Sequence, residues 1–469
     1  MAPAPEQQHP PAETIRVVDT ALVHPAVPSP PETSLPLTFF DIFWLHAPPV
    51  QRVFFYRLDA GAEADPVVSN LKRSLSQALR TIFPLAGRLR LAPGTANRYE
   101  LHYRPGDSVA FTVAEYNDDD GSLEADEPRE VSRLAPLAPP LPDGGAVLAL
   151  QATVLKCGGL ALGVTVHHAA GDGAASTHFL HTWAACCAGI TGTGTKPPPV
   201  PPVIDRTLIS DPTGLYDAFC PTTENTNKFA KVSSAAAEDQ LLFGTFVLSR
   251  AHLQRVKDLV AAEAATRGVA PPPRCSTLVA TLGLIWSCYR RANTKPGSNV
   301  SGGKNKTCLG FPVDYRPRMD PPLPATYFGN CVGAAIAIAS RAELASSGAT
   351  GLWAACAAVA ASIQEAGHGF GKETSRLWKE RVMEEAGMSV LSVAGSPRFR
   401  VYDLDFGFGR PAKVDIVSVA RTGAIALAES RVGDGGMEVG LALPPDGMAA
   451  FRKCFADAVA GLDQDAGRS

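Results

Sequence analysis

The sequence predicts a mixed α/β fold built from two domains. Strand-like and helix-like stretches alternate in both halves of the chain, which favours mixed layers of sheet and helix. With 469 residues the chain is long for one hydrophobic core, so two domains of roughly 200 residues each are expected. A Pro-rich stretch over residues 197–202 has the extended composition of a linker. The predicted division is an N-terminal domain over residues 1–190, a crossover over 191–236 and a C-terminal domain over 237–469.

Composition and charge exclude several classes of protein. Apolar residues make up 45% and charged residues 19% of the chain, the balance of an ordinary globular protein. A net charge of −3 gives no electrostatic footprint for nucleic acid or an anionic membrane, so neither is predicted as a partner. Residues 1–13 lack the basic and apolar segments of a secretory signal, and no apolar run is long enough to span a bilayer. A cytoplasmic location is therefore expected.

The ten cysteines are scattered along the chain and form no C-x-x-C unit. Their spacing does not support a zinc ribbon or a thioredoxin-like motif, so no metal site is predicted. Free thiols in a reducing compartment are the simplest interpretation. A cysteine nucleophile paired with one of the ten histidines stays open, although no spacing singles one out.

In the N-terminal half, β-prone runs predict strands and one periodic run predicts a helix. Leu71, Leu75 and Leu79 recur at helical spacing, so a helix is expected over residues 66–83, where Pro84 ends it. The aromatic cluster at 35–45 is expected in the core, and the acidic stretch at 117–130 as a solvated loop. Strands are expected at 15–23, 51–57, 87–91, 99–103, 109–113, 147–156 and 160–167, the last two as a hairpin.

The C-terminal half shows the same mixture of patterns. Pro-rich breaks and glycines separate its periodic segments. Strands are expected at 243–248, 308–313, 332–338, 399–403, 413–419, 424–428 and 437–443. Helices are expected at 250–267, 278–291, 341–368, 373–385 and 446–462.

The first candidate for chemistry lies at the end of the predicted strand over residues 160–167. This strand leads directly into His167-His168-Ala-Ala-Gly-Asp172-Gly, and a helix over 174–188 follows. Imidazole has the unperturbed pKa nearest neutrality, so a histidine held there can take a proton from an alcohol. Asp172 could orient that histidine or lock the loop. The competing interpretation is two hydrogen-bonded histidines at a strand-to-helix junction with Asp172 as a helix cap, and the motif alone does not decide.

Three further features lie elsewhere in the chain. Ser276 and Thr277 precede a helix, where their hydroxyls can cap free N–H groups or meet an anion. Arg316 follows a strand and could pair bidentately with a buried acid such as Asp172. The loop at 405–409 allows close approach of a ligand or is simply a turn, and it matches no nucleotide or kinase motif. No G-x-S-x-G elbow occurs, so a serine hydrolase would lack its usual nucleophile presentation.

The motifs taken together resemble one known family. In their order and separation they are similar to those of the plant BAHD acyl-CoA-dependent acyltransferases, and the resemblance covers essentially the whole chain. The motif Tyr327-Phe-Gly-Asn-Cys331 resembles that of the branch that acylates anthocyanin and flavonoid glucosides, commonly with malonyl-CoA. The motifs are His168-Ala-Ala-Gly-Asp172, Tyr327-Phe-Gly-Asn-Cys331 and Asp405-Phe-Gly-Phe-Gly409, supported by residues 35–41 and by Ser276-Thr277.

The resemblance implies an α/β fold of the chloramphenicol-acetyltransferase type, with two similarly sized domains, mixed sheets flanked by helices and a channel between the domains. The catalytic pair would be His168, the base in the channel, and Asp172, turned away from the substrate and tied to an arginine. Arg316 is the candidate for that arginine, and Asn330 is expected to be structural. The residues expected to bind CoA are Ser276, Thr277, Asp405, Gly407, Gly409 and Arg410.

One residue departs from the family pattern. The family loop usually reads Asp-Phe-Gly-Trp-Gly, and Phe408 stands here in place of the Trp. An aromatic wall for the substrate is still expected, without the indole N–H. A malonyl group would need a cation for its free carboxylate, and Arg398 and Arg410 flank the loop. Either arginine could instead face solvent or the CoA phosphates.

The predicted activity is transfer of an acyl group, most simply malonyl from malonyl-CoA, to a hydroxyl of a flavonoid, anthocyanin or other phenolic glucoside. His168 would act as general base without a covalent enzyme intermediate, a metal or a permanently bound cofactor. Acyl-CoA and a glycosylated phenolic acceptor are the expected partners of a monomeric protein.

Three other activities are compatible with parts of this pattern. One is an O-acyltransferase that uses hydroxycinnamoyl-CoA, which would need a different pocket. Another is a non-catalytic homologue that binds small molecules, which the intact His168 and Asp172 argue against. Peptide-condensation domains carry a similar histidine motif, but no carrier-protein segment is attached here.

Overall fold

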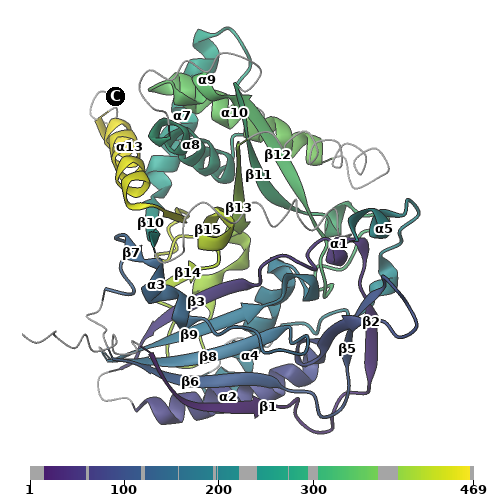
Figure 1. Ribbon diagram of the computed structural model, residues 1–469. Coiled ribbons are helices and arrows are strands. Elements are labelled where there is room, and N and C mark those ends of the chain that lie inside the picture. The colour runs from purple at the N-terminus through teal and green to yellow at the C-terminus, as the bar shows by residue number, and fades with distance from the viewer. Residues whose placement is uncertain are drawn as a thin grey trace, which may run out of the picture.

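The computed structural model describes residues 15–59, 63–117, 122–156, 158–193, 197, 199–220, 240–272, 274–293, 305–367 and 389–464. Two mixed sheets, each flanked by helices, form two layered halves that lie against each other (Figure 1). The predicted α/β class with mixed sheets is therefore confirmed. The helix predicted over residues 373–385 and the N-terminal tail lie outside the described residues.

The first sheet belongs mainly to the N-terminal half. Five of its six strands come from the first 166 residues and the sixth comes from the C-terminal part. In spatial order they are β1 (Ile15–Val23), β6 (Val109–Tyr116), β8 (Leu148–Leu155), β9 (Gly159–Val166), β3 (Val50–Arg57) and β14 (Lys413–Ile416). The predicted hairpin is the antiparallel pair β8 and β9.

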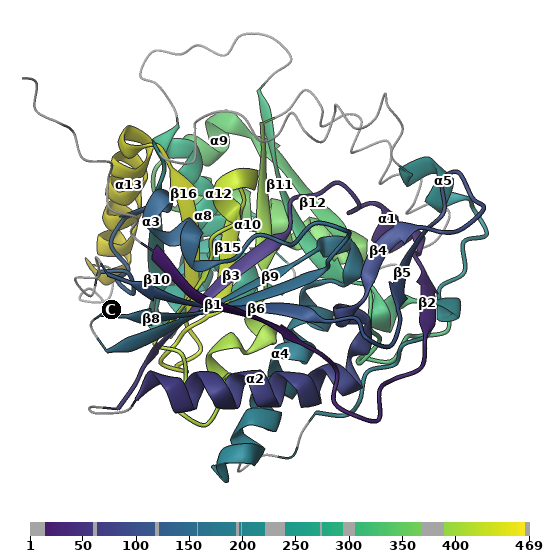
Figure 2. The same cartoon turned by 60° about the horizontal axis from the view of Figure 1, so that its bottom comes forward.

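Two long helices cover one face of this sheet, α2 (Ala64–Thr81) and α4 (Gly173–Thr191), as Figure 2 shows. The leucines of the helical stripe, with Leu71 and Leu75 fully buried, pack with Trp183 of α4 and with strand residues such as Phe111 in one core. The sequence pattern and the packing thus agree, because a stripe repeating every three to four residues meets a sheet. A small sheet of β2 (Thr33–Pro36), β5 (Tyr99–Tyr103) and β4 (Arg88–Leu91) lies at one end.

The second sheet has seven strands, six of which come from the C-terminal half. In spatial order they are β12 (Val332–Ser340), β11 (Lys306–Asp314), β13 (Ser389–Gly395), β15 (Ile425–Glu429), β16 (Met437–Leu443), β10 (Leu242–Leu248) and β7 (Arg129–Glu130). Its helices pack in a separate core around the fully buried Trp286. They are α7 (Arg250–Thr266), α8 (Thr277–Ala292), α9 (Arg341–Ala345), α10 (Ala349–Ala366) and α13 (Pro445–Gln464).

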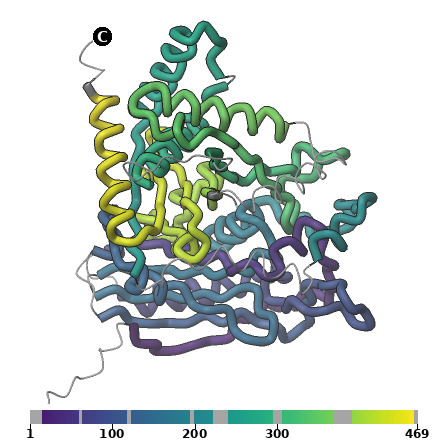
Figure 3. The backbone as a smooth tube through the Cα atoms, turned by 45° about the horizontal axis from the view of Figure 1, so that its top comes forward, coloured from purple at the N-terminus to yellow at the C-terminus, as the bar shows by residue number. Residues whose placement is uncertain are grey.

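Each half contributes one strand to the sheet of the other half. The late strand β14 pairs antiparallel with β3 at the edge of the first sheet. In the opposite direction, the short strand β7 pairs with β10 at the edge of the second sheet. The tube view shows the yellow-green end of the chain lying against the purple and blue strands (Figure 3). The two halves are therefore joined by backbone hydrogen bonds as well as by side chains.

Some predicted elements are wrong in detail. Residues 399–403 are not a strand but parts of two short 3-10 turns, η7 (Pro397–Phe399) and η8 (Val401–Asp403). Arg400, between them, has φ +52°, a left-handed conformation that an extended strand cannot contain. The strand expected over 413–419 stops at Ile416, and α12 (Val419–Thr422) follows.

Three other expectations need correction. The helix predicted over 341–368 is the pair α9 and α10, because Gly348 between them has φ +68°. Strand β13 was not anticipated. The acidic stretch is not simply a solvated loop, since Asp126 forms ion pairs with Lys413 and Arg431 from the other half. Lys413 is fully buried, and a buried ammonium needs such a carboxylate.

Candidate active site

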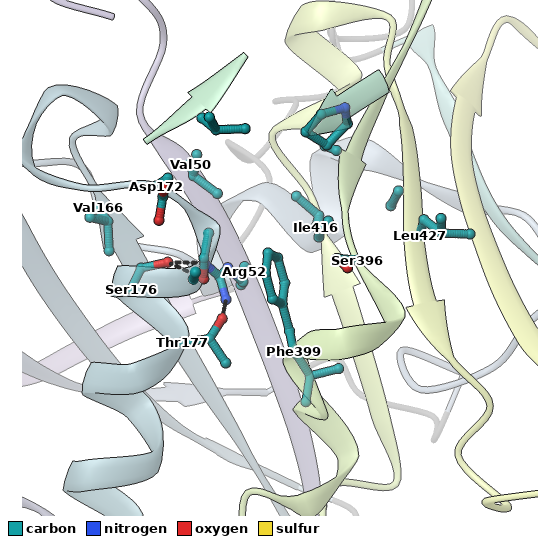
Figure 4. A pocket seen from close by; sticks show the side chains of 18 of the residues that line it. Val50, Arg52, Val166, Asp172, Ser176, Thr177, Ser396, Phe399, Ile416 and Leu427 are labelled. Carbon is teal, nitrogen blue, oxygen red and sulfur yellow. Dashed lines mark hydrogen bonds between the residues drawn. The ribbon is translucent and has the colours of Figure 1, made fainter. Parts of the chain in front are cut away.

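A cavity of about 1990 Å³ lies between the two halves. Its lining comes from the N-terminal half through β3, the end of β9 and the start of α4, and from the C-terminal half through β11, β12 and β13. Figure 4 shows the part where Arg52, Ser176 and Thr177 face Phe399. Small-molecule pockets typically measure roughly 300–1,000 Å³. The cavity is therefore large enough for two substrates together.

His168 lies at the point where β9 reaches this cavity. The strand ends at Val166, and the single 3-10 turn η3 (His168–Ala170) follows. His167 caps that turn, because its Nδ1 accepts the backbone N–H of Ala169 at 3.2 Å. Burial, with the nearby charges of His168 and His46, lowers the pKa of His167 to about 4. His168 lines the cavity and His167 does not, so the structure presents His168 to a ligand.

The tautomer of His168 follows from its contact with Asn330. The Nδ1 of His168 lies 3.2 Å from Asn330 Oδ1. The Asn330 amide nitrogen donates to Asp41 Oδ1 and to the backbone carbonyl of His168, both at 2.9 Å. These two groups accept only, so the amide nitrogen is fixed and Oδ1 must face the imidazole. Nδ1 therefore carries the proton, and Nε2 keeps the lone pair that a base requires.

Packing and burial hold the imidazole neutral. The ring of Trp44 stacks on that of His168, with centroids 3.8 Å apart and an interplanar angle of 14°. Burial lowers the pKa of His168 below its ordinary value, although a backbone hydrogen bond, Asp172 and Asn330 act in the opposite direction. A neutral imidazole in a fixed orientation is the form that can accept a proton near neutral pH.

Asp172 is tied to Arg316, as the sequence predicted. The guanidinium binds the carboxylate bidentately, Nη1 to Oδ2 at 2.9 Å and Nη2 to Oδ1 at 3.1 Å. Asp172 also caps α4 through the N–H of Ala175 and accepts the N–H of Cys331. Burial alone would raise the pKa of Asp172, but the charge and hydrogen bonds of Arg316 outweigh it and lower that pKa. This ion pair thus ties the loop after His168 to the C-terminal half.

A second ion pair holds Asn330 in place. Asp41, which is fully buried, accepts both the backbone and the side-chain N–H of Asn330 at 2.9 Å. Arg206 contacts the same carboxylate at 3.2 Å and also donates to the hydroxyl of Tyr327. A Cβ on Gly329 would collide with the Arg206 guanidinium, so only glycine fits there. The Tyr327 motif is thus a packed platform that positions Asn330.

The loop at 405–409 folds around its own aspartate. Asp405 accepts the N–H groups of Gly407 and Gly409 at 2.8 and 3.0 Å. Gly407 has φ +95°, and a Cβ there would lie 2.5 Å from the Thr191 hydroxyl. Phe408 packs edge-on to Tyr56, with centroids 5.0 Å apart, in the core of the first sheet. Asp405 lines the cavity but Phe408 does not, so the expected aromatic wall for the substrate is not seen.

Exposed arginines gather at the rim of the cavity. Arg398, Arg400 and Arg410 all line it and are all exposed. Arg400 pairs with Asp403 at 2.6 Å and Arg410 approaches the same carboxylate at 3.5 Å. These three cations exceed the two carboxylates of the same stretch, Asp403 and Asp405, so this rim is positive, which suits the phosphates of a nucleotide-bearing ligand.

Ser276 and Thr277 lie outside the cavity lining, as do Gly407, Phe408 and Gly409 of the loop at 405–409. Ser276 caps α8, since its hydroxyl accepts the N–H of Val279 at 3.3 Å. Thr277 accepts from the Lys257 ammonium at 3.2 Å. The capping role is therefore confirmed for Ser276. Neither residue is in the lining, so their contact with CoA stays a prediction.

Several residues of the site were not predicted. They are Trp44 on the imidazole, Arg206 under the Tyr327 motif, Arg400 at the rim and Arg52 in the cavity wall. Asp41 lies inside the aromatic cluster at 35–45, and an acid in such a cluster is itself a signal, because a buried carboxylate needs partners. Arg206 and Arg52 carry no local signal, since their partners are more than 100 positions away in sequence.

The described residues hold no group of three or more side chains that could bind a metal ion. In the same part of the chain, no helix has the length and apolar character needed to cross a membrane. The cysteines that the structure describes are all free.

Comparison with known proteins gives four findings. The family model described as the Transferase family matches residues 13–458. Phenolic glucoside malonyltransferase 1 of Arabidopsis thaliana is 35% identical over 456 residues, which is 92% of this chain and 94% of that protein. The malonyl-coenzyme:anthocyanin 5-O-glucoside-6'''-O-malonyltransferase of Salvia splendens is 31% identical over 480 residues, 97% of this chain and 98% of that one. The crystal structure of vinorine synthase has the same fold, with a TM-score of 0.68 at 21% identity over 93% of this chain and 96% of that chain.

Proposed function

The chain belongs to the Transferase family of BAHD acyl-CoA-dependent acyltransferases, and on this premise we propose that it moves a malonyl group from malonyl-CoA to a hydroxyl of a phenolic glucoside. Two malonyltransferases of glucosylated phenolics that align with nearly the whole chain support this donor and acceptor class. The positive rim of the cavity fits the phosphates of CoA.

The observation that carries the proposal is the fixed imidazole of His168. Its Nδ1 is engaged by Asn330, and Nε2 remains for the acceptor hydroxyl. In the proposed step, Nε2 takes the hydroxyl proton while the oxygen attacks the thioester carbonyl. The tetrahedral intermediate then collapses and expels the CoA thiolate, which receives the proton from the imidazolium. No covalent bond to the protein forms.

Positioning supplies the rest of the proposed acceleration. One cavity can hold donor and acceptor side by side, which converts a bimolecular reaction into an effectively unimolecular one. Asp172 has no free oxygen for the substrate, because both of its oxygens are bonded to Arg316. We therefore assign Asp172 the task of holding the loop and not of transferring a proton.

The structure also motivates a proposal for assembly and location. One chain supplies both walls of the cavity, so we propose that a monomer is competent. Free thiols at every described cysteine fit a reducing compartment such as the cytoplasm.

The proposal is tested with purified protein, a panel of acyl-CoA donors and a mixture of phenolic glucosides, with products identified by mass. Wild-type protein is expected to form a malonyl ester. Preferential transfer from hydroxycinnamoyl-CoA would correct the donor, and no product from any donor would contradict the activity.

His168→Ala is expected to lower the rate of transfer by at least about 100-fold, because general base catalysis contributes roughly 10²–10⁴-fold. His167→Asn is the matched control, since asparagine can still accept the N–H of Ala169 and the residue lies outside the cavity lining. Near-normal turnover by His168→Ala would contradict the assignment of the base.

A further inference from the structure

Arg52 is a buried cation in the cavity wall. It is only 5% exposed, lies on β3 and lines the cavity. Its guanidinium donates to the hydroxyl of Thr177 at 3.0 Å and to that of Ser176, both on the first turns of α4 (Figure 4). Hydroxyls are neutral acceptors, so these bonds orient the guanidinium without balancing its charge.

No carboxylate of the described residues pairs with Arg52. The acids that line the cavity are each bonded to another group, either an arginine or a loop N–H. These acids are Asp172 and Asp314 with Arg316, Asp403 with Arg400, Asp405 with its own loop, Asp415 with Arg129, and Glu438 with Arg431. The other buried arginines of the site, Arg206 and Arg316, each have an aspartate partner. Arg52 is the exception among them.

The charge of Arg52 persists despite this environment. Burial lowers the pKa of Arg52 to about 10, which still leaves the guanidinium protonated at neutral pH. The first turn of α4 lies beside it, and a helix N-terminus adds positive potential instead of relieving it. A buried charge without a counter-charge is costly, and such groups concentrate at functional sites. The position of Arg52 is therefore electrostatically suited to an anionic ligand.

The register of the sheet places Arg52 near the base. Strands β3 and β9 are antiparallel, with Arg52 opposite Val164 and Val50 opposite Val166. His168 follows Val166 by two residues, so the cation and the imidazole border the same end of the cavity. A ligand anion bound there must lie a short distance from the reacting carbonyl. In a malonyl thioester, one methylene separates the carboxylate from that carbonyl.

We propose that Arg52 binds the free carboxylate of the acyl group and so selects the CoA monothioester of a short dicarboxylic acid over a neutral acyl-CoA. This inference rests on the proposed transfer reaction and adds the residue that sets its donor class. It differs from the sequence-based expectation for Arg398 and Arg410, which are exposed at the rim and so remain hydrated. Buried charge-assisted hydrogen bonds discriminate more strongly than exposed ones.

The test compares malonyl-CoA with acetyl-CoA on one phenolic glucoside. Arg52→Met keeps the aliphatic volume and removes the charge. The ratio of kcat/KM for malonyl-CoA to that for acetyl-CoA is expected to fall by about 10- to 100-fold, because a hydrogen bond to a charged group is lost. Arg57→Met, the same change at an exposed arginine on the same strand and outside the cavity lining, is the matched control and is expected to preserve the preference.

The outcomes separate the two proposals. If wild-type protein transfers neither acyl group, the proposed function fails. If wild-type protein is active and Arg52→Met has an unchanged ratio, or loses both activities equally, the role of Arg52 is overturned. A second measurement needs no variant: the methyl ester of malonyl-CoA, which has no charge, should be at least about tenfold poorer than malonyl-CoA for wild-type protein. Equal use of the two donors would also overturn the inference.

Discussion

A single side-chain amide fixes which nitrogen of His168 is the base. Asn330 can present only its oxygen to the imidazole, since its nitrogen is held by Asp41 and by the backbone of His168. Histidine bases in other enzymes are commonly oriented by a carboxylate, which would raise the imidazole pKa. A neutral amide orients the ring without adding a negative charge beside it. The low pKa of His168 is consistent with that arrangement.

The pH dependence of transfer follows from this pKa. The base works when neutral, so the rate should fall as His168 becomes protonated on acidification. Because burial lowers the pKa of His168, the midpoint of the acid limb of kcat/KM should lie below pH 6.5, where an ordinary histidine would be half protonated. The profile is measured with acetyl-CoA, whose acyl group does not titrate. A midpoint at or above pH 6.5 would contradict this prediction.

At the scale of residues, local chemistry was predictable and long-range partners were not. His168 and Asp172 lie in one short motif, and Arg316 was identified because a buried acid calls for an arginine. Trp44 lies more than 120 positions from the imidazole on which it stacks, and Arg206 reaches Asp41 from the crossover. Such contacts depend on how the two halves meet, and periodicity within a segment carries no information about that.

At the scale of elements, strongly periodic segments were predicted well and short irregular ones were not. Helix α2 and the hairpin of β8 and β9 follow from their apolar patterns. The turns η7 and η8 were mistaken for a strand because their residues are β-prone, and only the left-handed φ of Arg400 reveals the break. Strand β7 has two residues, too few for a period to be recognised, whereas β14 was predicted over 413–419 but ends after four residues.

The start of helix α8 provides a prediction at this scale. Ser276→Ala should lower the free energy of unfolding by about 1 kcal/mol, the usual loss for a removed N-cap hydroxyl. The KM for acyl-CoA should not change, because Ser276 lies outside the cavity lining. Urea unfolding and donor-saturation curves of the same preparation measure both. A severalfold rise in KM would instead support the sequence-based expectation that this residue contacts CoA.

At the scale of the whole molecule, the site belongs to neither half alone. The imidazole comes from the N-terminal half, while Asn330 and Arg316 come from the C-terminal half. Two buried ion pairs, Asp172 with Arg316 and Asp41 with Arg206, close the junction around it. Removing one partner of such a pair typically costs about 3–5 kcal/mol, because the other charge stays buried. The general base is therefore held in its working orientation only when the two halves are docked.

The exchanged strands predict that the halves cannot fold apart. Residues 1–190 expressed alone should not show a cooperative unfolding transition, since the first sheet lacks β14 and the edge of β3 is open. Residues 237–469 expressed alone should also show no cooperative unfolding transition, because the second sheet then lacks β7. Co-expression of residues 1–236 with residues 237–469 is the control and should restore transfer activity. A cooperative unfolding transition of either fragment alone, monitored by circular dichroism, would contradict this prediction.

The late position of β14 in the chain also has a consequence for how the protein is synthesised and folded. Strand β3 leaves the ribosome early, but its partner at residues 413–416 is synthesised only near the end of the chain. While residues 58–412 are being translated, the edge of β3, with Phe54 and Phe55 beside it, has no native neighbour on that side. An unpaired apolar edge is where nascent chains aggregate, and contacts between such distant residues form slowly. The stage between translation of β3 and that of β14 is therefore where a chaperone, a lower growth temperature or a slower ribosome would most improve the yield of folded enzyme.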